Sequence, residues 1–256
     1  RGIFACMLTI KKSLGQHFLK DENVSRRIIE VIQERPLKNL VEVGPGGGAL
    51  TKYLVNLPGV NLKCIEIDDE KVKFLADAFP RLKNNIIHED ILETGVPFDE
   101  PFTLVGNFPY NISTQIIFRV IEWKNNIESM IGMFQKEVAQ RIAAKEGSKI
   151  YGVTSVLVQA YFSVDYLFEV EENAFHPPPK VKSAVISLTP LSTPVTVKSD
   201  RALSVLVKTA FNQRRKTLRN AVKSLFTADT LKDEIFNKRA EELSVQQFAE
   251  LTFTMH

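Results

Sequence analysis

The chain has 256 residues, of which 44% are hydrophobic and 25% charged, a composition typical of a globular protein with room for one large and one small domain. Charged residues interrupt every hydrophobic stretch, and no apolar run approaches the roughly 20 residues that a membrane-spanning helix needs. The first lysines follow an apolar stretch instead of preceding it, which is the wrong order for a secretory signal. We therefore expect a soluble, cytoplasmic protein without membrane contacts, and whether the residues before Met7 are native stays open.

The net charge and the cysteines bear on whether the protein binds nucleic acid, forms disulfides or holds a metal. A formal net charge of +3 permits nucleic-acid binding without establishing it. The two cysteines, Cys6 and Cys64, have a spacing that favours neither a disulfide framework nor a zinc site. We expect no bound metal, and reduced thiols agree with a cytoplasmic location.

Helix and strand signals alternate from residue 21 to about residue 134. Asp21 can cap a helix that runs through Ile32. Short β-rich segments follow, with helical patterns between most of them, at residues 39–43, 61–67, 85–87, 102–105 and 129–134. This alternation is the βαβ signature of an open, mostly parallel sheet with right-handed crossovers.

The rest of the chain completes this sheet and then becomes helical. A helix is expected near residues 153–161, and strands at 164–170 and 183–188 are expected to form an antiparallel edge. Residues 189–199 hold Pro190 and Pro194 among serine and threonine, as a linker does. We therefore predict an α/β fold in which residues 1–190 form a Rossmann-like catalytic domain and residues 191–256 form a small all-helical domain.

Within the helical region, residues 203–226 have the periodicity of one amphipathic helix with a basic stripe. Its apolar positions are Leu203, Leu206, Val207, Ala210, Phe211, Leu218, Val222 and Leu225. Its basic residues, which we expect to bind RNA, are Lys208, Arg214, Arg215, Lys216, Arg219 and Lys223. The charge pattern alone is equally compatible with the solvated face of an ordinary surface helix.

A glycine cluster, Gly44-Pro45-Gly46-Gly47-Gly48, lies between the first strand of the sheet and the next helix. A backbone without side chains can turn tightly there and approach a ligand closely, at the edge where open α/β sheets bind nucleotides. A glycine turn without a ligand and a dinucleotide site are the alternatives.

Acidic residues follow the next two strands. Glu66 comes about 20 residues after the glycine cluster, a spacing suited to binding ribose hydroxyls, whereas Asp68 can instead cap the following helix. Asp90 follows the third strand and can accept a hydrogen bond from an adenine amine, although it can also be a solvated loop carboxylate. Together with Gly44 and Gly46, these acids predict a crevice that binds a nucleoside.

The fourth strand leads into Asn107-Phe108-Pro109-Tyr110. An exocyclic amine conjugated with a purine ring is a poor nucleophile, so an enzyme must orient its lone pair. The side-chain oxygen of Asn107 and the backbone carbonyl of Pro109 can accept both amine hydrogens, and Tyr110 offers a face for stacking the base. A turn that uses asparagine and proline for conformation alone is the alternative.

Four segments, taken together, resemble those of the ribosomal RNA adenine dimethyltransferases, and most of all the bacterial small-subunit enzymes. The resemblance runs from about residue 11 to residue 220, and the combination is highly specific although each segment alone is not. The segments are residues 15–19 (GQHFL), 43–46 (VGPG), 106–111 (GNFPYN) and 175–181 (FHPPPKV).

This resemblance implies a methyltransferase domain that uses S-adenosylmethionine as methyl donor and needs no metal. It implies dimethylation of adenine amines in 16S rRNA of the small ribosomal subunit, during ribosome biogenesis, by a protein that we expect to be a monomer. Large-subunit rRNA methyltransferases that confer antibiotic resistance are the nearest alternative. An assembly factor that acts mainly by binding is another, and the Asn-Pro-aromatic segment also suits methylation of DNA adenine or of protein glutamine.

The resemblance also implies roles for individual residues. An N-terminal segment closes over the cofactor, so His17 and Leu19 are expected to contact it, as is Asn107. The family usually carries asparagine at the position of His17 and often leucine at that of Phe108. Phe175 is expected to stack the flipped adenine together with Tyr110. The residues around Phe175 in the sequence, taken alone, favour a core aromatic residue instead.

Overall fold

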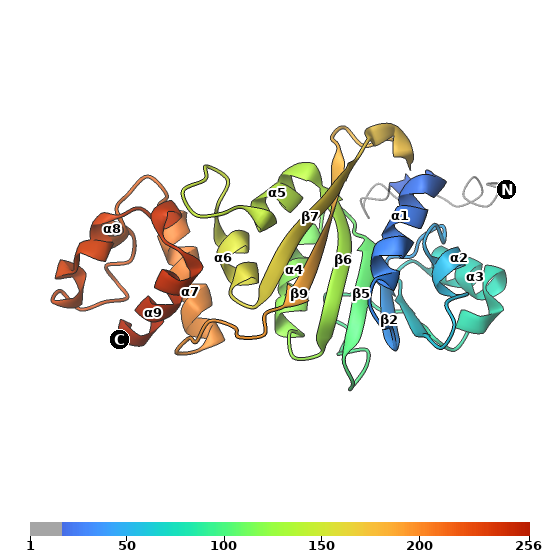
Figure 1. Cartoon of the computed structure of the whole chain (residues 1–256), viewed down its shortest axis with the longest axis horizontal. Coiled ribbons are helices and arrows are strands. Elements are labelled where there is room, and N and C mark those ends of the chain that lie inside the picture. Colours follow the sequence, from blue (N-terminus) through green and yellow to red (C-terminus); the bar gives the residue numbers. More distant parts are fainter. Residues whose placement is uncertain (1–16) are drawn as a thin grey trace. The chain divides into compact units, whose positions relative to one another are not determined.

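The computed structural model describes residues 17–256 (Figure 1), so the predictions made for Cys6, Met7 and residues 15 and 16 lie outside the described residues. The contacts divide the chain into two compact units. One unit runs through Ala139 and includes Asp165–Thr189, and the other consists of Gln140–Val164 and Pro190–His256. The predicted domains at 1–190 and 191–256 stay a prediction, and they differ from these units because Gln140–Val164 groups with the C-terminal helices. In the described part of the chain, no helix is long and apolar enough to span a bilayer.

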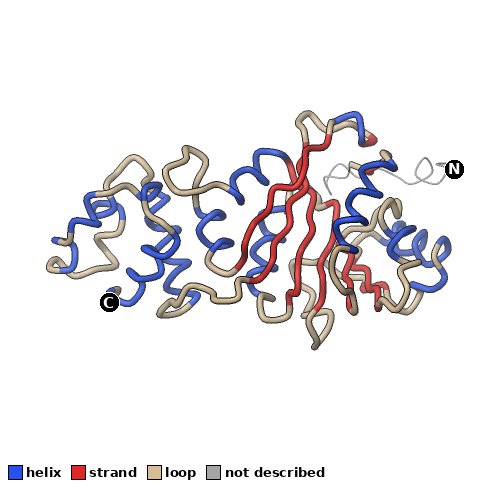
Figure 2. Tube along the Cα trace, in the orientation of Figure 1, coloured by secondary structure: helices blue, strands red, loops and turns tan. Residues whose placement is uncertain are grey.

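The central sheet has seven strands in the order β4-β3-β2-β5-β6-β9-β7 (Figure 2). Strands β4, β3, β2, β5 and β6 pair in parallel along this order, and β9 pairs antiparallel with β6. The predicted mostly parallel sheet with an antiparallel pairing near its edge is thus confirmed. The strands are β2 (Asn39–Val43), β3 (Asn61–Ile65), β4 (Ile86–Ile87), β5 (Phe102–Asn107), β6 (Ile127–Gln135), β7 (Phe162–Val170) and β9 (Ser183–Pro190).

A second, two-stranded sheet joins the start of the described chain to the loop before β9. Its strands β1 (Phe18–Leu19) and β8 (Phe175–His176) are antiparallel, with Leu19 opposite Phe175. The amides of Lys20 and Asp21 also donate to the carbonyl of Ala174, which lengthens this connection. Two segments more than 150 residues apart in the chain are therefore hydrogen-bonded to each other.

The helices begin and end at recognisable signals. The longest in the first unit, α1, is capped as predicted, because the Asp21 side chain accepts hydrogen bonds from the amides of Asn23 and Val24. The helices are α1 (Glu22–Gln33), α2 (Thr51–Leu54), α3 (Asp69–Ala78), α4 (Ser113–Glu122), α5 (Lys136–Ala143), α6 (Val153–Gln159), α7 (Asp200–Asn212), α8 (Leu218–Ala221) and α9 (Val245–Leu251). Single turns of 3₁₀ helix occur at Pro80–Leu82, Glu172–Ala174, Thr230–Lys232, Glu234–Asn237, Ala240–Glu242 and Thr252–Thr254.

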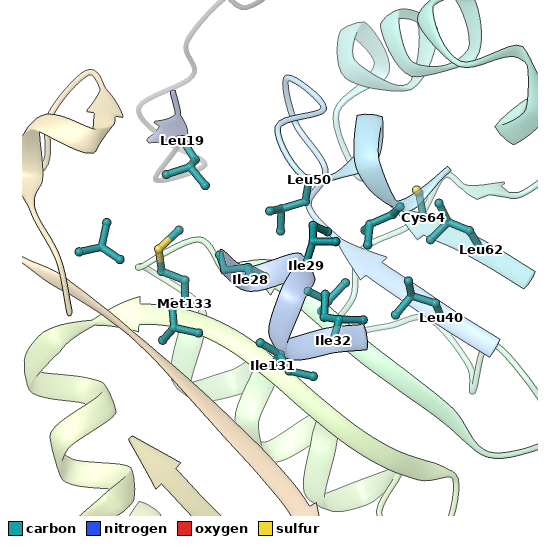
Figure 3. Close-up of a cluster of buried hydrophobic side chains, with 14 of the residues drawn as sticks. Leu19, Ile28, Ile29, Ile32, Leu40, Leu50, Leu62, Cys64, Ile131 and Met133 are labelled. Carbon is teal, nitrogen blue, oxygen red and sulfur yellow. The ribbon is translucent and has the colours of Figure 1, made fainter. Parts of the chain in front are cut away.

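The core of the first unit lies between α1 and the sheet (Figure 3). Ile28, Ile29 and Ile32 recur at helical spacing on the buried face of α1. They join a cluster that includes Leu40 of β2 and Leu50 of the segment before α2. Full burial of one such side chain is worth about 1.5–3 kcal/mol, so this cluster holds α1 against the sheet.

The predicted helix over residues 203–226 is wrong. The helix α7 ends at Asn212, and α8 begins only at Leu218, after Thr217 adopts extended backbone angles. The amide of Leu218 donates to the carbonyl of Lys238 at 2.7 Å in place of a helical partner. Leu218 and Val222 stay buried, so the apolar spacing persists across a break that it did not reveal.

Candidate active site

A cavity of about 570 Å³ lies at the carboxyl ends of the parallel strands. Its size is within the range of small-molecule and cofactor sites. Nine of the ten residues predicted for the catalytic and cofactor sites line it, namely His17, Leu19, Gly44, Gly46, Glu66, Asp90, Asn107, Pro109 and Tyr110. Parallel strands end at one edge of the sheet, which is why segments spread over almost 100 residues meet there.

The glycine cluster forms the tight turn that its composition predicts. Gly44 and Gly46 have φ angles of 63° and 51°, in the left-handed region that side chains rarely adopt. A Cβ on Gly46 would also lie 3.0 Å from the ring of Phe18. Glycine at this position therefore lets the first strand of the small sheet pack directly on the turn.

Glu66 connects this turn to the end of β3. One of its carboxylate oxygens accepts a hydrogen bond from the amide of Gly46, and the other accepts one from the amide of Asp68, each at 3.1 Å. Burial raises the pKa of Glu66, and the two amide hydrogen bonds oppose that rise. Asp68 caps α3 by accepting from the amide of Glu70, which is the alternative role foreseen for it.

Glu42 is a cavity residue that the sequence analysis missed. It is fully buried, and the hydroxyl of Thr51 donates to its carboxylate at 2.7 Å. Burial raises its pKa to about 7, and the nearby Glu66 contributes to that rise. Its signal in the sequence was a lone acid inside the continuous apolar strand β2, where a charge has no solvent to face.

Asp90 and Ile67 form another part of the cavity wall. Asp90 follows β4, and its side chain accepts a hydrogen bond from the amide of Leu92 at 2.9 Å. Ile67, which the sequence analysis did not single out, is 48% exposed and lines the same cavity. The wall therefore offers a carboxylate beside an exposed apolar side chain, a combination suited to a heterocyclic ring with polar edges.

Asn107 is the last residue of β5, and its side chain is oriented by the N-terminal segment. Its amide nitrogen donates to the backbone carbonyl of His17 at 2.9 Å. No other hydrogen bond to this side chain comes from the part of the chain that the structure describes, so its oxygen can accept one. The carbonyl of Pro109 accepts from the amide of Ile112 at 3.2 Å and keeps a second lone pair.

Phe108 borders the cavity, and its ring fills the core beneath the site. It is fully buried, with its ring 5.0 Å from that of Phe134. A Cβ on Gly132 would lie 2.3 Å from the Phe108 ring, and one on Gly106 would lie 2.7 Å from it. Two glycines thus make room for an aromatic ring where the family often has leucine.

Tyr110 is held at both its ring and its hydroxyl. Its ring stacks on that of His17, with centroids 5.2 Å apart and planes 29° apart. Its hydroxyl is hydrogen-bonded to the side chain of Ser183 in β9, and burial raises the pKa of that hydroxyl. The tyrosine predicted to stack a base is therefore rigidly mounted before any base arrives.

Phe175 is the predicted site residue that the structure does not bring to the cavity surface. Its side chain is fully buried and belongs to the same core cluster as Leu19 and Ala174. This agrees with the core aromatic that its sequence surroundings favour. In this conformation it has no face for a base, and its stacking role stays a prediction.

The basic residues of the C-terminal unit do not form one continuous stripe. Arg214 pairs with Glu241 at 2.7 Å, and the guanidinium of Arg219 donates to the carbonyl of Leu231. Arg214, Arg215 and Lys216 lie in the turn between α7 and α8, whereas Lys208 is on α7 and Lys223 follows α8. Their role in binding RNA stays a prediction. Among the described residues, no group of three or more His, Cys, Asp or Glu side chains could hold a metal ion.

The model of one protein family, the ribosomal RNA adenine dimethylases, matches residues 7–254. Relatives from Flavobacterium johnsoniae and Phocaeicola vulgatus, each named ribosomal RNA small subunit methyltransferase A, are both 49% identical to the chain. Both alignments cover 94% of this chain, and they cover 94% and 88% of the respective relatives.

Two solved structures are similar in fold. A dimethyladenosine transferase from Plasmodium falciparum has a TM-score of 0.77 at 24% identity, and a 23S rRNA methyltransferase, ErmE, has a TM-score of 0.72 at 22% identity. Each likeness covers 93% of this chain and 99% of the other. At this level of identity they support the α/β methyltransferase fold predicted from the sequence, which is confirmed.

Proposed function

The chain belongs to the ribosomal RNA adenine dimethylase family, and we propose that it methylates the exocyclic amines of adenines in small-subunit rRNA with S-adenosylmethionine as donor. Membership of this family confirms the resemblance predicted from the sequence. The preference for the small subunit is supported by two relatives that are 49% identical and are named as small-subunit methyltransferases. The observation that carries the proposal is the oriented amide of Asn107 in a cavity that Glu66 and Asp90 also line.

The cavity has the features that a nucleoside-containing methyl donor requires. Gly46 lacks the side chain that would press on Phe18, so the glycine turn keeps its tight shape beside the cavity. Glu66 is suited to accept hydrogen bonds from ribose hydroxyls, and Asp90 from an adenine amine. Leu19 of β1 and His17 just before it border the cavity, and we assign them a backbone role in closing it. When bound, S-adenosylmethionine supplies a methyl group on a positively charged sulfur.

The protein's part in the reaction is to orient the target. The target adenine has to leave its stack, and Tyr110 can then stack it, an interaction worth roughly 1–3 kcal/mol. The side-chain oxygen of Asn107 and the carbonyl of Pro109 accept the two amine hydrogens and direct the lone pair along the line of attack. Good positioning alone can lower a barrier by about 7–11 kcal/mol, so no strong base is needed. After one transfer the methylated amine loses one proton and keeps one hydrogen, so a second transfer is chemically reasonable.

The test is methyl transfer from labelled S-adenosylmethionine, offered in parallel to unmethylated small subunits, large subunits, naked rRNA and DNA. We expect label as dimethyladenosine in the RNA of small subunits. Label only in large-subunit RNA would favour the antibiotic-resistance type of activity instead, and label only in protein or DNA would refute the proposal. The predicted cytoplasmic location and monomeric state stay predictions.

A further inference from the structure

His17 makes three contacts, each with a different part of the proposed target site. Its backbone carbonyl accepts a hydrogen bond from the amide nitrogen of Asn107 at 2.9 Å. Its ring nitrogen Nδ1 lies 2.8 Å from the carbonyl oxygen of Pro177. Its ring stacks on Tyr110. One residue therefore touches the group that would read the amine, the ring that would stack the base and the loop that follows Phe175.

The hydrogen bond to Pro177 determines which ring nitrogen of His17 acts as the donor. A carbonyl oxygen has no hydrogen to donate, so the hydrogen between the two atoms belongs to Nδ1 of His17. Both the neutral Nδ1–H tautomer and the protonated ring carry that hydrogen. The contact is therefore compatible with either charge state of the histidine.

The loop of residues 177–181 has few other attachments. Pro177, Pro178 and Pro179 have no N–H and cannot join a strand ladder through it. Within the described part of the chain, the bond from His17 is the sole hydrogen bond made to residues 177–181. The next hydrogen bond along the chain is at Lys182, whose carbonyl accepts from the amide of Lys136 at 2.9 Å.

The far end of the loop returns to the same tyrosine. Ser183 follows Lys182 at the start of β9, and its hydroxyl bonds that of Tyr110. The ring of Tyr110 in turn lies on His17. His17 contacts Pro177 at one end of the loop and the ring of Tyr110, and Tyr110 contacts Ser183 just beyond the other end. These contacts form a closed circuit, and His17 is its member that borders the cofactor cavity.

We propose that His17 is a positioning residue, whose side chain links the segment that closes over the cofactor to the loop of residues 177–181. Through these contacts it sets the positions of Tyr110 and Pro177 when an adenine enters. This inference rests on the proposed function. In this proposal the imidazole of His17 acts in the methylation of RNA, and only the backbone of its segment contacts the methyl donor. Loss of the donor nitrogen that binds Pro177 should therefore impair transfer to RNA while leaving cofactor affinity nearly intact.

Two substitutions separate the hydrogen bond from the size of the side chain. His17→Asn keeps a donor nitrogen attached to Cγ, at the place of Nδ1, so it can still reach the carbonyl of Pro177. His17→Leu keeps comparable bulk and has no donor. The matched control is His176→Leu, which removes an exposed histidine one residue before Pro177 without touching the circuit.

The experiment measures affinity for S-adenosylhomocysteine by calorimetry, together with kcat and KM for unmethylated small subunits. For His17→Leu we expect kcat/KM to fall about tenfold, the size of one strong hydrogen bond, with calorimetric affinity within about twofold of the wild type. His17→Asn should restore kcat/KM to within about threefold of the wild type. If His17→Leu does not fold, His17→Gln replaces it, because its donor sits one carbon further out.

Three outcomes would overturn the inference. The first is a cofactor affinity that falls as far as kcat/KM in His17→Leu, and the second is a His17→Asn variant as impaired as His17→Leu. The third is a His17→Leu variant that matches the wild type. A wild-type protein that transfers no methyl group to small subunits would instead overturn the proposed function, and this inference with it.

Discussion

Replacing the buried carboxyl of Glu42 with an amide should change how the stability of the protein depends on pH. Glu42 is fully buried and accepts a hydrogen bond from Thr51 at 2.7 Å. Its pKa of about 7 in the folded protein lies above its ordinary value of 4.5, mainly because burial disfavours the charged form. Glu42→Gln has the same shape, and its amide oxygen can still accept from Thr51.

The sign follows from the raised pKa. The folded state holds this proton more tightly than the unfolded state does, so its stabilising effect is complete below pH 4.5 and is lost as the pH rises through about 7. The pKa difference between the two states is about 2.5, which corresponds to about 3 kcal/mol. The wild type should therefore lose about 3 kcal/mol more stability than Glu42→Gln between pH 4.5 and pH 8.

Urea unfolding of both proteins at several pH values across this range measures the difference. The comparison removes most of the contribution of Glu66, whose pKa is also raised by burial and which both proteins contain, and only its repulsion with Glu42 stays in the difference. Parallel stability curves for the two proteins would refute the reasoning, because they would mean that the carboxyl of Glu42 titrates alike in the folded and unfolded states. A Glu42→Gln variant that is less stable than the wild type at pH 8 would contradict it too.

Three further predictions concern the proposed chemistry. Asn107→Ala should lower kcat by roughly 10²-fold, as loss of one oriented polar group at a reacting centre does, a larger effect than any change it causes in the binding of S-adenosylhomocysteine measured by calorimetry. Gly46→Ala should weaken that binding, because a side chain at its φ of 51° costs about 1–2 kcal/mol and would press on Phe18. Arg215→Ala should make RNA affinity less dependent on salt, with the slope of log K against log salt smaller by about 0.7–0.9.

Each of these has an outcome that contradicts it. Full transfer by Asn107→Ala would remove the catalytic assignment and favour a factor that acts by binding. Unchanged calorimetric affinity in Gly46→Ala would mean that the glycine turn does not border the cofactor. An unchanged salt slope in Arg215→Ala, with Lys83→Ala as a control far earlier in the chain than the predicted basic residues, would remove that arginine from the RNA contacts.

Much of the fold could be predicted because its signals are local. Asp21 caps α1 as expected, and β2 spans the predicted residues 39–43. Once the strands are parallel, their carboxyl ends must meet, so Gly44, Glu66 and Asp90 were brought together by topology alone. Glu42 escaped notice because its chemistry depends on burial, which the sequence only hinted at by placing an acid in an apolar strand.

The long C-terminal helix could not be corrected from periodicity. Leu218 and Val222 keep helical spacing with the residues of α7, yet the chain turns at residues 213–217. The turn is stabilised by a hydrogen bond from Leu218 to Lys238, twenty residues further on. A pattern of hydrophobic side chains records which residues are buried, but not whether the backbone between them is continuous helix.

The sequence by itself determined the sheet, the glycine turn, the acids at the strand ends and the amine-reading segment at Asn107, because each depends on residues close together in the chain. Tertiary structure decided which residues surround that segment. The contacts of His17 with Asn107, Tyr110 and Pro177 span up to 160 residues. Phe175 is buried by the same packing of β8 on β1. Such contacts arise only when distant segments are packed against one another, and no local pattern of residues specifies them.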